Sequence, residues 1–144
     1  MLNSDVLFHP QILKDLLESS HDNALLISYH RESTEPLGDE EMKVKVEEDV
    51  VIDISKQMDP LEADGENVGI VKFSPAGAGL LIRYMDDLVA KGSANAWAPR
   101  AFREFATHHK LHAVSTRGYP WIEIDFPEDY QKAVNEIYPS IAQY

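Results

Sequence analysis

Apolar residues recur along the chain at two spacings, which predict alternating helices and strands. A helical spacing of three and four residues occurs at Pro10 to Ser19, Leu80 to Ala90, Pro99 to His108 and Pro127 to Tyr138. Strand-length apolar or alternating runs occur at Ala24 to Tyr29, residues 41 to 47, Val50 to Ser55, Val68 to Phe73, Leu111 to Ser115 and Trp121 to Ile124. This order predicts an α/β fold, with a mixed sheet flanked by helices.

The chain reads as a single domain over residues 1–144. It shows no internal repeat and no linker rich in glycine, serine or proline, and its length suits one hydrophobic core. Met1 and Leu2 have the character of the end of a strand that leads directly into a polar loop. We therefore expect an incomplete sheet whose neighbouring strands lie outside these residues.

Charge and composition exclude several classes of partner. Acidic residues outnumber basic ones by 25 to 13, giving a formal charge of −12 and no basic stripe, so we expect no nucleic acid partner. No apolar run is long enough to cross a bilayer, and Asp5 and His9 interrupt what would be a signal peptide, so we expect no membrane. The absence of cysteine excludes disulfides and thiolate metal sites. We expect a cytoplasmic protein.

The segment near the end of the chain carries the most informative polar pattern. In an extended strand Trp121, Glu123 and Asp125 share one face, while Ile122 and Ile124 point to the core. Open α/β sheets bind ligands at the carboxyl ends of their strands, and Mg²⁺ prefers one or two carboxylates together with substrate phosphates. A metal site at this strand end is one interpretation.

Local chemistry offers simpler roles for two of these acids. Asp125 and Glu128 have the spacing of a capping box for the last helix, which local chemistry alone favours over metal binding. Asp5 follows the strand-like Met1-Leu2 and precedes a helix, so a turn or cap role is favoured when it is considered alone.

Several segments together resemble a known enzyme family. The run Asn3-Ser4-Asp5-Val6-Leu7-Phe8 resembles the "NGDV" segment of the sugar-1-phosphate and phosphocholine nucleotidyltransferases, and Trp121 to Asp129 resembles their "W-x-E-I-D-x-x-x-D" segment. Further similar segments fall between them in the family's order: Glu41-Met42-Lys43-Val44, Ile54-Ser55-Lys56 and Gly65 to Ile70. The resemblance covers nearly the whole chain. It is nearest to the branch that activates phosphocholine or phosphonates such as 2-aminoethylphosphonate.

The resemblance implies a fold and a set of site residues. The fold would be the C-terminal half of a Rossmann-like nucleotidyltransferase domain. Asp5 and Asp125 would bind the Mg²⁺ that bridges nucleotide and acceptor, and Lys56 would contact the acceptor's phosphate or phosphonate as the catalytic residue. Ser4 departs from the family, which usually has glycine there, so a side chain is added near the phosphates.

Further residues would bind the acceptor. Glu66 matches a carboxylate that contacts the acceptor in the family. If the acceptor carries an amine or trimethylammonium group, Glu66 and Glu123 would supply counter-charge and Trp121 an aromatic face. Lys43 is expected on the solvent-exposed face of its strand, where it is either a solvated lysine or a residue that reaches the substrate.

The implied activity moves a nucleotidyl group from an NTP, with CTP favoured, to phosphocholine, aminoethylphosphonate or a sugar 1-phosphate, and releases pyrophosphate. The family's glycine-rich nucleotide loop has no counterpart here, because Gly77-Ala78-Gly79 is interpreted as a turn into a helix. We therefore expect the chain alone to be inactive. The alternative is a non-catalytic remnant, or a subunit that assembles with a separate nucleotide-binding half. A homodimer is also compatible with an unpaired sheet edge.

Overall fold

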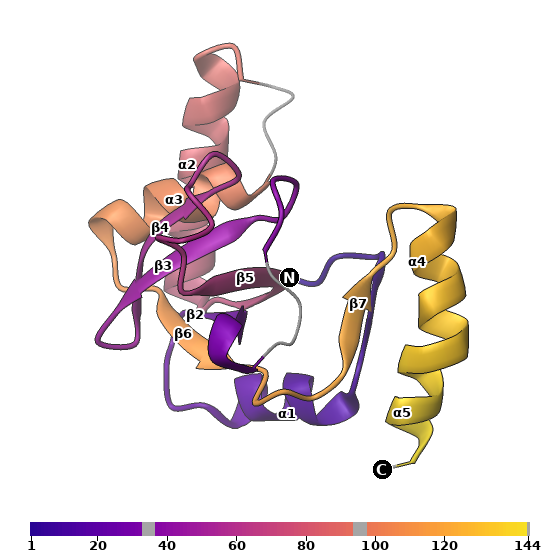
Figure 1. Cartoon of the computed structure of the whole chain (residues 1–144). Helices are drawn as coiled ribbons and strands as arrows, with labels where there is room; N and C mark the ends of the chain where they lie inside the picture. The colour runs from indigo at the N-terminus through magenta and orange to yellow at the C-terminus, as the bar shows by residue number, and fades with distance from the viewer. Residues whose placement is uncertain (33–36, 94–97, 144) are drawn as a thin grey trace.

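A computed structural model describes residues 1–32, 37–93 and 98–143 (Figure 1). Its strands are β1 (Val6–Phe8), β2 (Ala24–Tyr29), β3 (Lys43–Glu47), β4 (Val50–Ser55), β5 (Gly65–Lys72), β6 (His112–Ser115) and β7 (Trp121–Glu123). Its helices are α1 (Pro10–Glu18), η1 (His30–Glu32), α2 (Pro75–Ala90), α3 (Ala98–His108), α4 (Pro127–Lys132), η2 (Ala133–Ile137) and α5 (Tyr138–Ala142). None of these described helices combines the length and apolarity needed to span a bilayer.

Five strands form one mixed sheet that closes on itself in the order β2-β5-β3-β4-β6. The β2–β6 pair is parallel and the other pairs are antiparallel, so the predicted mixed sheet with flanking helices is confirmed. The closure is narrow, because β4 and β6 meet through the single pair Val50 and His112. This closure contradicts the incomplete sheet with an unpaired edge that we expected, since the register between strands distant in sequence leaves no local pattern.

A second, two-stranded sheet joins the two ends of the chain. Strand β1, which sequence analysis missed because it has only three residues, pairs antiparallel with β7, with Val6 opposite Glu123 and Phe8 opposite Trp121. Leu2 forms an isolated bridge with Ile70 of β5, and the backbone N–H of Val71 donates to the Met1 carbonyl at 3.0 Å. Met1 and Leu2 thus contact β5 through a single bridge and do not form the strand end that was predicted there.

The two faces of β2 serve different cores. Leu25, Ile27 and Tyr29 belong to a core formed with α2, α3, β3 and β4, whereas Ala24 and Leu26 belong to a smaller core covered by α1. Partly buried residues of the β1–β7 pair, among them Phe8 and Trp121, pack against this smaller core. Because successive side chains of a strand point to opposite faces, β2 contributes alternate residues to two hydrophobic cores, one on each side of it.

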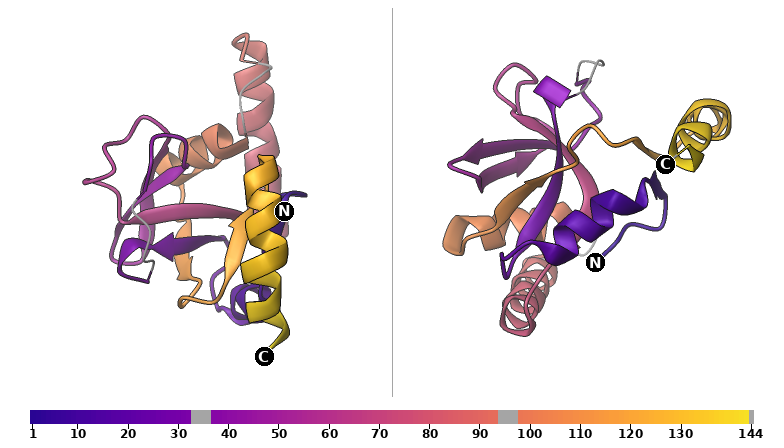
Figure 2. Two further views of the ribbon diagram at one scale, coloured as in Figure 1. Left: turned by 45° about the vertical axis from the view of Figure 1, so that its right-hand side comes forward. Right: turned by 90° about the horizontal axis from the view of Figure 1, so that it is seen from below.

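The closing helical segment departs from the simple helix expected over Pro127 to Tyr138. It runs through α4, the π-helical η2 and α5 as one column beside β7 (Figure 2). Pro139 lies in α5, and proline provides no backbone N–H and crowds the preceding turn. The N–H of Tyr138 donates to the carbonyl of Ala133, five residues back, so the wider π turn lies directly before the proline.

Helix α2 also differs from its predicted start at Leu80. It begins at Pro75, with the Ser74 side chain accepting from the N–H of Gly77 at 3.1 Å. Gly77 and Gly79 therefore lie inside the helix and do not form a turn before it. A side chain at Gly77 would collide with the amide of Asn23, so this glycine serves close packing.

A contact between two distant segments makes Gly69 sensitive to substitution. Gly69 has a φ of +79°, and its carbonyl accepts from the Asn3 N–H at 2.9 Å. A Cβ there would lie 2.6 Å from the Asn3 side-chain nitrogen. Gly92 has a φ of +81°, but a Cβ at that residue would meet no atom of the described residues within 4 Å beyond its chain neighbours, which makes Gly92 a matched control.

We predict that Gly92→Ala lowers the free energy of unfolding by about 1 kcal/mol, the cost of a left-handed backbone. Gly69→Ala should cost roughly 1–3 kcal/mol more, because the Asn3 contact must also be displaced. Urea unfolding followed by circular dichroism measures both variants. Equal losses would mean that Asn3 moves aside without cost.

Candidate metal and acceptor site

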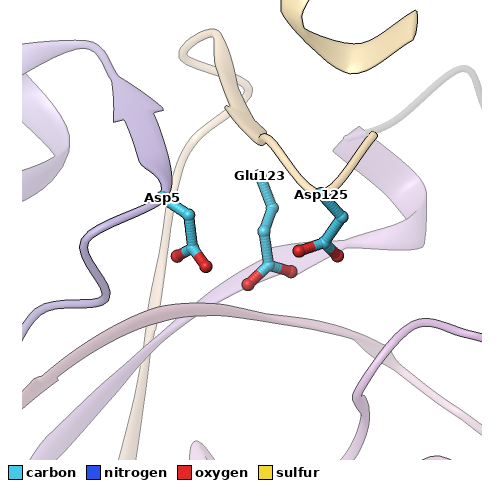
Figure 3. A group of neighbouring side chains, drawn as sticks. All are labelled: Asp5, Glu123 and Asp125. Atoms are coloured by element: carbon cyan, nitrogen blue, oxygen red, sulfur yellow. The ribbon is translucent and has the colours of Figure 1, made fainter. Parts of the chain in front are cut away.

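Three carboxylates from the two ends of the chain converge where β1 and β7 meet. Asp5 directly precedes β1, Glu123 ends β7, and Asp125 follows two residues later. The N–H of Ile124 donates to the Asp5 carbonyl at 2.8 Å, which continues the pairing of the two strands. Figure 3 shows the three side chains directed toward one another, and one oxygen from each lies within 4.8 Å of the others. We call these three residues the carboxylate cluster.

This position corrects one expectation about Asp5. It does not end a strand, because Leu2 is only an isolated bridge, and it stands instead at the start of β1. Antiparallel pairing brings the start of β1 to the end of β7, so Asp5 still reaches Asp125.

The spacing of the carboxylate cluster suits a small divalent cation. Mg²⁺ binds oxygen at about 2.0–2.1 Å, so two ligands on opposite sides of the ion lie about 4.2 Å apart. Adjacent ligands lie only about 2.9 Å apart, so the cluster oxygens, separated by at most 4.8 Å, would draw closer together around a bound ion. In the described parts of the chain, no other three acidic or histidine residues meet in this way.

The electrostatics of Glu123 agree with an acidic site whose negative charge is only partly compensated. Burial raises the pKa of the Glu123 carboxyl, and the negative charges of Asp125 and Asp5 raise it further. A hydrogen bond from the Asn3 side chain, at 3.4 Å, and the positive charge of Lys56 lower the pKa in part. Sequence analysis placed Glu123 on the same strand face as Asp125 and assigned it to the substrate, and the structure places it within the carboxylate cluster.

The capping role considered for Asp125 is wrong. The N-cap of α4 is Phe126, one residue later. The carboxylate of Asp129, and not that of Glu128, accepts from the N–H groups of Phe126 at 2.9 Å and Asp125 at 3.1 Å. Asp125 contributes its backbone N–H to this cap, and its carboxylate faces the cluster.

The expected orientation of β7 is also corrected. We predicted that Ile122 and Ile124 would face the core, but neither belongs to a core cluster. Trp121 instead packs against the smaller core, on the same side as Glu123. The β1–β7 pair turns inward the face that carries Val6, Phe8 and Trp121, and Glu123 lies on this same face, which accounts for its partial burial.

Lys43 does not occupy the solvent-exposed face predicted for it. Its side chain is 1% exposed, because β3 is paired on both sides at this residue, with Ser55 and Glu66 as neighbours. The ammonium group donates to the carbonyls of Lys56 at 2.7 Å, Asp39 at 3.2 Å and Glu41 at 3.3 Å. Lys43 therefore fixes the backbone at Lys56.

A cleft of about 650 Å³ lies beside the carboxylate cluster. It is lined by four predicted site residues, namely Glu66, Trp121, Glu123 and Asp125, whereas Asp5, Lys43 and Lys56 are not among its lining residues. Lys56 forms an ion pair with Glu40, a lining residue, at 3.6 Å. Among the described residues, eight carboxylates but a single lysine, Lys132, line the cleft, so its field favours cations.

Sequence analysis missed other lining residues, including Ser28, His30 and Thr116. Ser28 lies next to the last residue of β2, and His30 and Thr116 directly follow β2 and β6, at the same end of this parallel pair. The only signal in the sequence was a polar residue closing an apolar strand, which is too common to identify a site.

No protein-family profile and no curated protein matches this sequence. Solved structures do match. The inositol-1-phosphate CTP transferase from T. maritima aligns with a TM-score of 0.67 and 19% identity, over 96% of this chain and 54% of that protein. A protein named as a glucose-1-phosphate thymidylyltransferase from Bacillus anthracis, in complex with a sucrose, aligns with a TM-score of 0.68 and 13% identity, over 92% and 51%.

The chain has a nucleotidyltransferase fold. It spans about half the length of these structural neighbours, and at such low identity the likeness concerns the fold alone. The predicted fold class is thereby confirmed. The roles of the individual site residues remain predictions.

The raised pKa of Glu123 predicts how stability depends on pH. A carboxyl whose pKa is higher in the folded than in the unfolded protein loses stabilising free energy as pH rises through the folded pKa. In buffer with EDTA, Glu123→Gln should therefore increase the unfolding temperature at pH values where the Glu123 carboxyl is ionised, and the gain should vanish as this carboxyl becomes protonated at lower pH. Thermal unfolding between pH 4 and pH 8 measures this. A constant difference at every pH would contradict the assigned repulsion.

Proposed function

We propose that this chain forms the metal- and acceptor-binding part of a nucleotidyltransferase. The observation that carries the proposal is the convergence of Asp5, Glu123 and Asp125 beside a cleft. A nucleotidyltransferase fold and the order of the sequence segments support it.

The proposed reaction is a single displacement at phosphorus. An oxygen of the acceptor's phosphate or phosphonate attacks the α-phosphorus of an NTP, with CTP favoured. A new P–O bond forms, the bond to the β-phosphate oxygen breaks, and pyrophosphate leaves. The attacking oxygen is already an anion, so no general base is required, and catalysis consists of positioning and charge neutralisation.

Each predicted residue has a role in this proposal. Asp5 and Asp125 hold Mg²⁺, which when bound neutralises negative charge on the phosphates. Glu123 lies beside both ligands and contributes charge to the same site. Lys56 orients the acceptor anion as a point charge. Lys43 acts indirectly, because its ammonium group holds the Lys56 carbonyl.

The acceptor is proposed to be a small phosphate or phosphonate, with phosphocholine, aminoethylphosphonate and sugar 1-phosphates as members of the class. Glu66 and Trp121 line the same cleft as Glu123 and Asp125, so an acceptor bound there meets both. The acidic lining favours members with a cationic end. A cysteine-free chain is compatible with the reducing cytoplasm, where we place the reaction.

We propose that residues outside these 144 grip the nucleotide, because the structural neighbours are about twice as long. An exposed apolar stripe, composed of Tyr130, Val134 and Tyr138 at helical spacing, supports docking of a complementary half or a second copy. A subunit without activity of its own is the second candidate, since the same stripe would serve assembly.

We predict that Mg²⁺ stabilises the chain through Asp5 and Asp125. A tenfold excess of free ion over its dissociation constant should add about 1.4 kcal/mol to the free energy of unfolding. Asp5→Asn and Asp125→Asn should lose this gain, and Asp22→Asn, at an exposed acid outside the cluster, should keep it.

Thermal unfolding with and without MgCl₂ provides the measurement. In EDTA both cluster variants should be at least as stable as the parent, because a like-charge repulsion is removed. Equal stabilisation of all four proteins by Mg²⁺ would refute a specific site.

We also predict that the 144-residue chain alone releases no pyrophosphate from CTP with phosphocholine or aminoethylphosphonate. The physical reason is that no glycine-rich loop is present in the sequence to cradle the nucleotide phosphates. A coupled pyrophosphate assay measures the release. Turnover above the rate of the Asp125→Asn variant would show that this chain binds the nucleotide itself.

A further inference from the structure

The helical column formed by α4, η2 and α5 has an exposed side without charged residues. The residues of the apolar stripe, Tyr130, Val134 and Tyr138, are 57%, 48% and 61% exposed. Beside the stripe runs a second exposed row with the same spacing of four, and its members are also uncharged: Pro127, Gln131, Asn135 and Pro139. We call these two rows together the neutral face.

The charges of the column lie on its other side. Glu128, Lys132 and Glu136 form one row of spacing four, and the last two line the cleft together with Asp129. Residues four apart on an α-helix drift by about 40° around its axis, and the wider π turn of η2 reduces this drift. The column therefore keeps its neutral and charged rows apart. Figures 1 and 2 show it at the margin of the molecule, with no described element on its far side.

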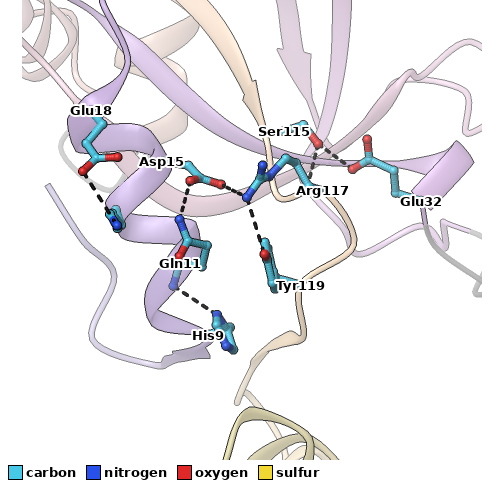
Figure 4. Close-up of polar contacts among 9 residues, drawn as sticks. His9, Gln11, Asp15, Glu18, Glu32, Ser115, Arg117 and Tyr119 are labelled. Atoms are coloured by element: carbon cyan, nitrogen blue, oxygen red, sulfur yellow. Dashed lines mark hydrogen bonds and ion pairs between the residues drawn. The ribbon is translucent and has the colours of Figure 1, made fainter. Parts of the chain in front are cut away.

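Other exposed surfaces of the described residues differ from the neutral face. On α1, Asp15 pairs with the guanidinium of Arg117 at 2.9 Å (Figure 4), and Lys14 pairs with Glu18 at 4.0 Å. Exposed large apolar side chains outside the column occur singly or in pairs, as at Leu61. A continuous line of such residues with a neutral surround is typical of a surface that another protein covers.

The neutral face has a pattern that is the same in both directions. The stripe contains tyrosine, valine and tyrosine, and the second row contains proline, two amide residues and proline. When two such helices pack antiparallel about a two-fold axis at Val134, Tyr130 of one copy lies opposite Tyr138 of the other. The same rotation brings Gln131 near Asn135 of the second copy, and the two amides can donate to and accept from each other. An isologous contact requires a self-complementary face of this kind.

We propose that a second copy of this chain docks on the neutral face, with its own helical column antiparallel to the first. The chain has a formal charge of −12, so two copies repel each other, and a face without charged residues brings no like charges into direct contact. A non-identical partner, such as a complementary half, would not require a self-complementary pattern. The charged rows that line the cleft stay outside the contact, so this inference is independent of the proposed reaction.

The size of the neutral face predicts a weak dimer. A tyrosine side chain can bury about 150–250 Å², so each tyrosine of the stripe leaves roughly 100 Å² to be covered. With its polar neighbours the face remains smaller than the standard interface of about 800 Å² per partner, in the range of transient contacts. We therefore expect a dissociation constant on the order of 10–100 µM.

The test measures the mass of the 144-residue chain by sedimentation equilibrium over a concentration range of about 5 to 500 µM, which brackets the expected dissociation constant. We expect the mass to rise with concentration from that of a monomer toward that of a dimer. Raising NaCl from about 0.15 M to 1 M should tighten the dimer about 2- to 5-fold, because salt screens the repulsion between two chains of the same charge.

The matched variants are Val134→Glu and Val89→Glu. Both replace an exposed helical valine, 48% and 57% exposed, but Val89 lies on α2 and not on the column. Val134→Glu places two like charges at the two-fold axis, so we expect the dissociation constant to rise at least about tenfold. Val89→Glu should leave the dissociation constant unchanged. Circular dichroism checks that both variants fold as the parent does.

Two double variants test the antiparallel register, and they decide the question if Val134→Glu does not fold. Tyr130→Lys with Tyr138→Glu places opposite charges across the antiparallel contact, whereas Tyr130→Glu with Tyr138→Glu places like charges there. We expect the first pair of changes to give a dimer at least about tenfold tighter than the second. A parallel contact would place like charges opposite each other in both variants, which would then be equally weak.

Each other outcome overturns the inference. A monomer at every concentration would show that no second copy covers the neutral face. A dimer that Val134→Glu leaves intact, or that Val89→Glu weakens equally, would place the contact elsewhere. A dimer that weakens in high salt would indicate ion pairs, and equal affinity of the two double variants would exclude the antiparallel register. The proposed function fails separately, when Mg²⁺ does not stabilise the chain through Asp5 and Asp125.

Discussion

The antiparallel pairing of β1 with β7 is the constraint on which the proposed site depends. It joins two segments from opposite ends of the chain and places Asp5 beside Asp125. The pairing also places Glu123 on the inward side, where burial and two like charges raise the pKa of its carboxyl. Folding thus assembles a local excess of negative charge, an arrangement that a divalent cation would stabilise.

The rest of the site is supported by residues that never enter the cleft. The Lys43 ammonium group donates three hydrogen bonds to backbone carbonyls, which compensates for the burial of its charge. The same hydrogen bonds hold the segments around Glu41 and Lys56 together. Arg117 fastens the loop between β6 and β7 to α1 through Asp15. These contacts give the cleft fixed walls, which reduces the ordering cost of binding a small ligand.

Some features of the fold follow directly from local sequence pattern. Two strands have strand-length runs that are rich in apolar residues, Ala24 to Tyr29 and Val50 to Ser55. Both strands were predicted with their observed bounds. The helices were found because their apolar faces repeat every three or four residues, although the proline at position 139 changed the last one into a π-containing segment. The prediction from local chemistry that Asp125 caps the last helix was wrong, because the cap lies one residue later and is formed by Phe126 and Asp129.

By itself the sequence determined the fold class, the strands and helices of ordinary length, and the candidate acids at each end of the chain. Only the tertiary structure decided that Asp5, Glu123 and Asp125 meet, that Lys43 is buried, and that Tyr130, Val134 and Tyr138 are exposed. The reason is physical: periodicity reports which face of an element is apolar, whereas register between distant strands depends on packing summed over the whole molecule. The local sequence around a residue does not indicate which residues will lie beside it on neighbouring strands.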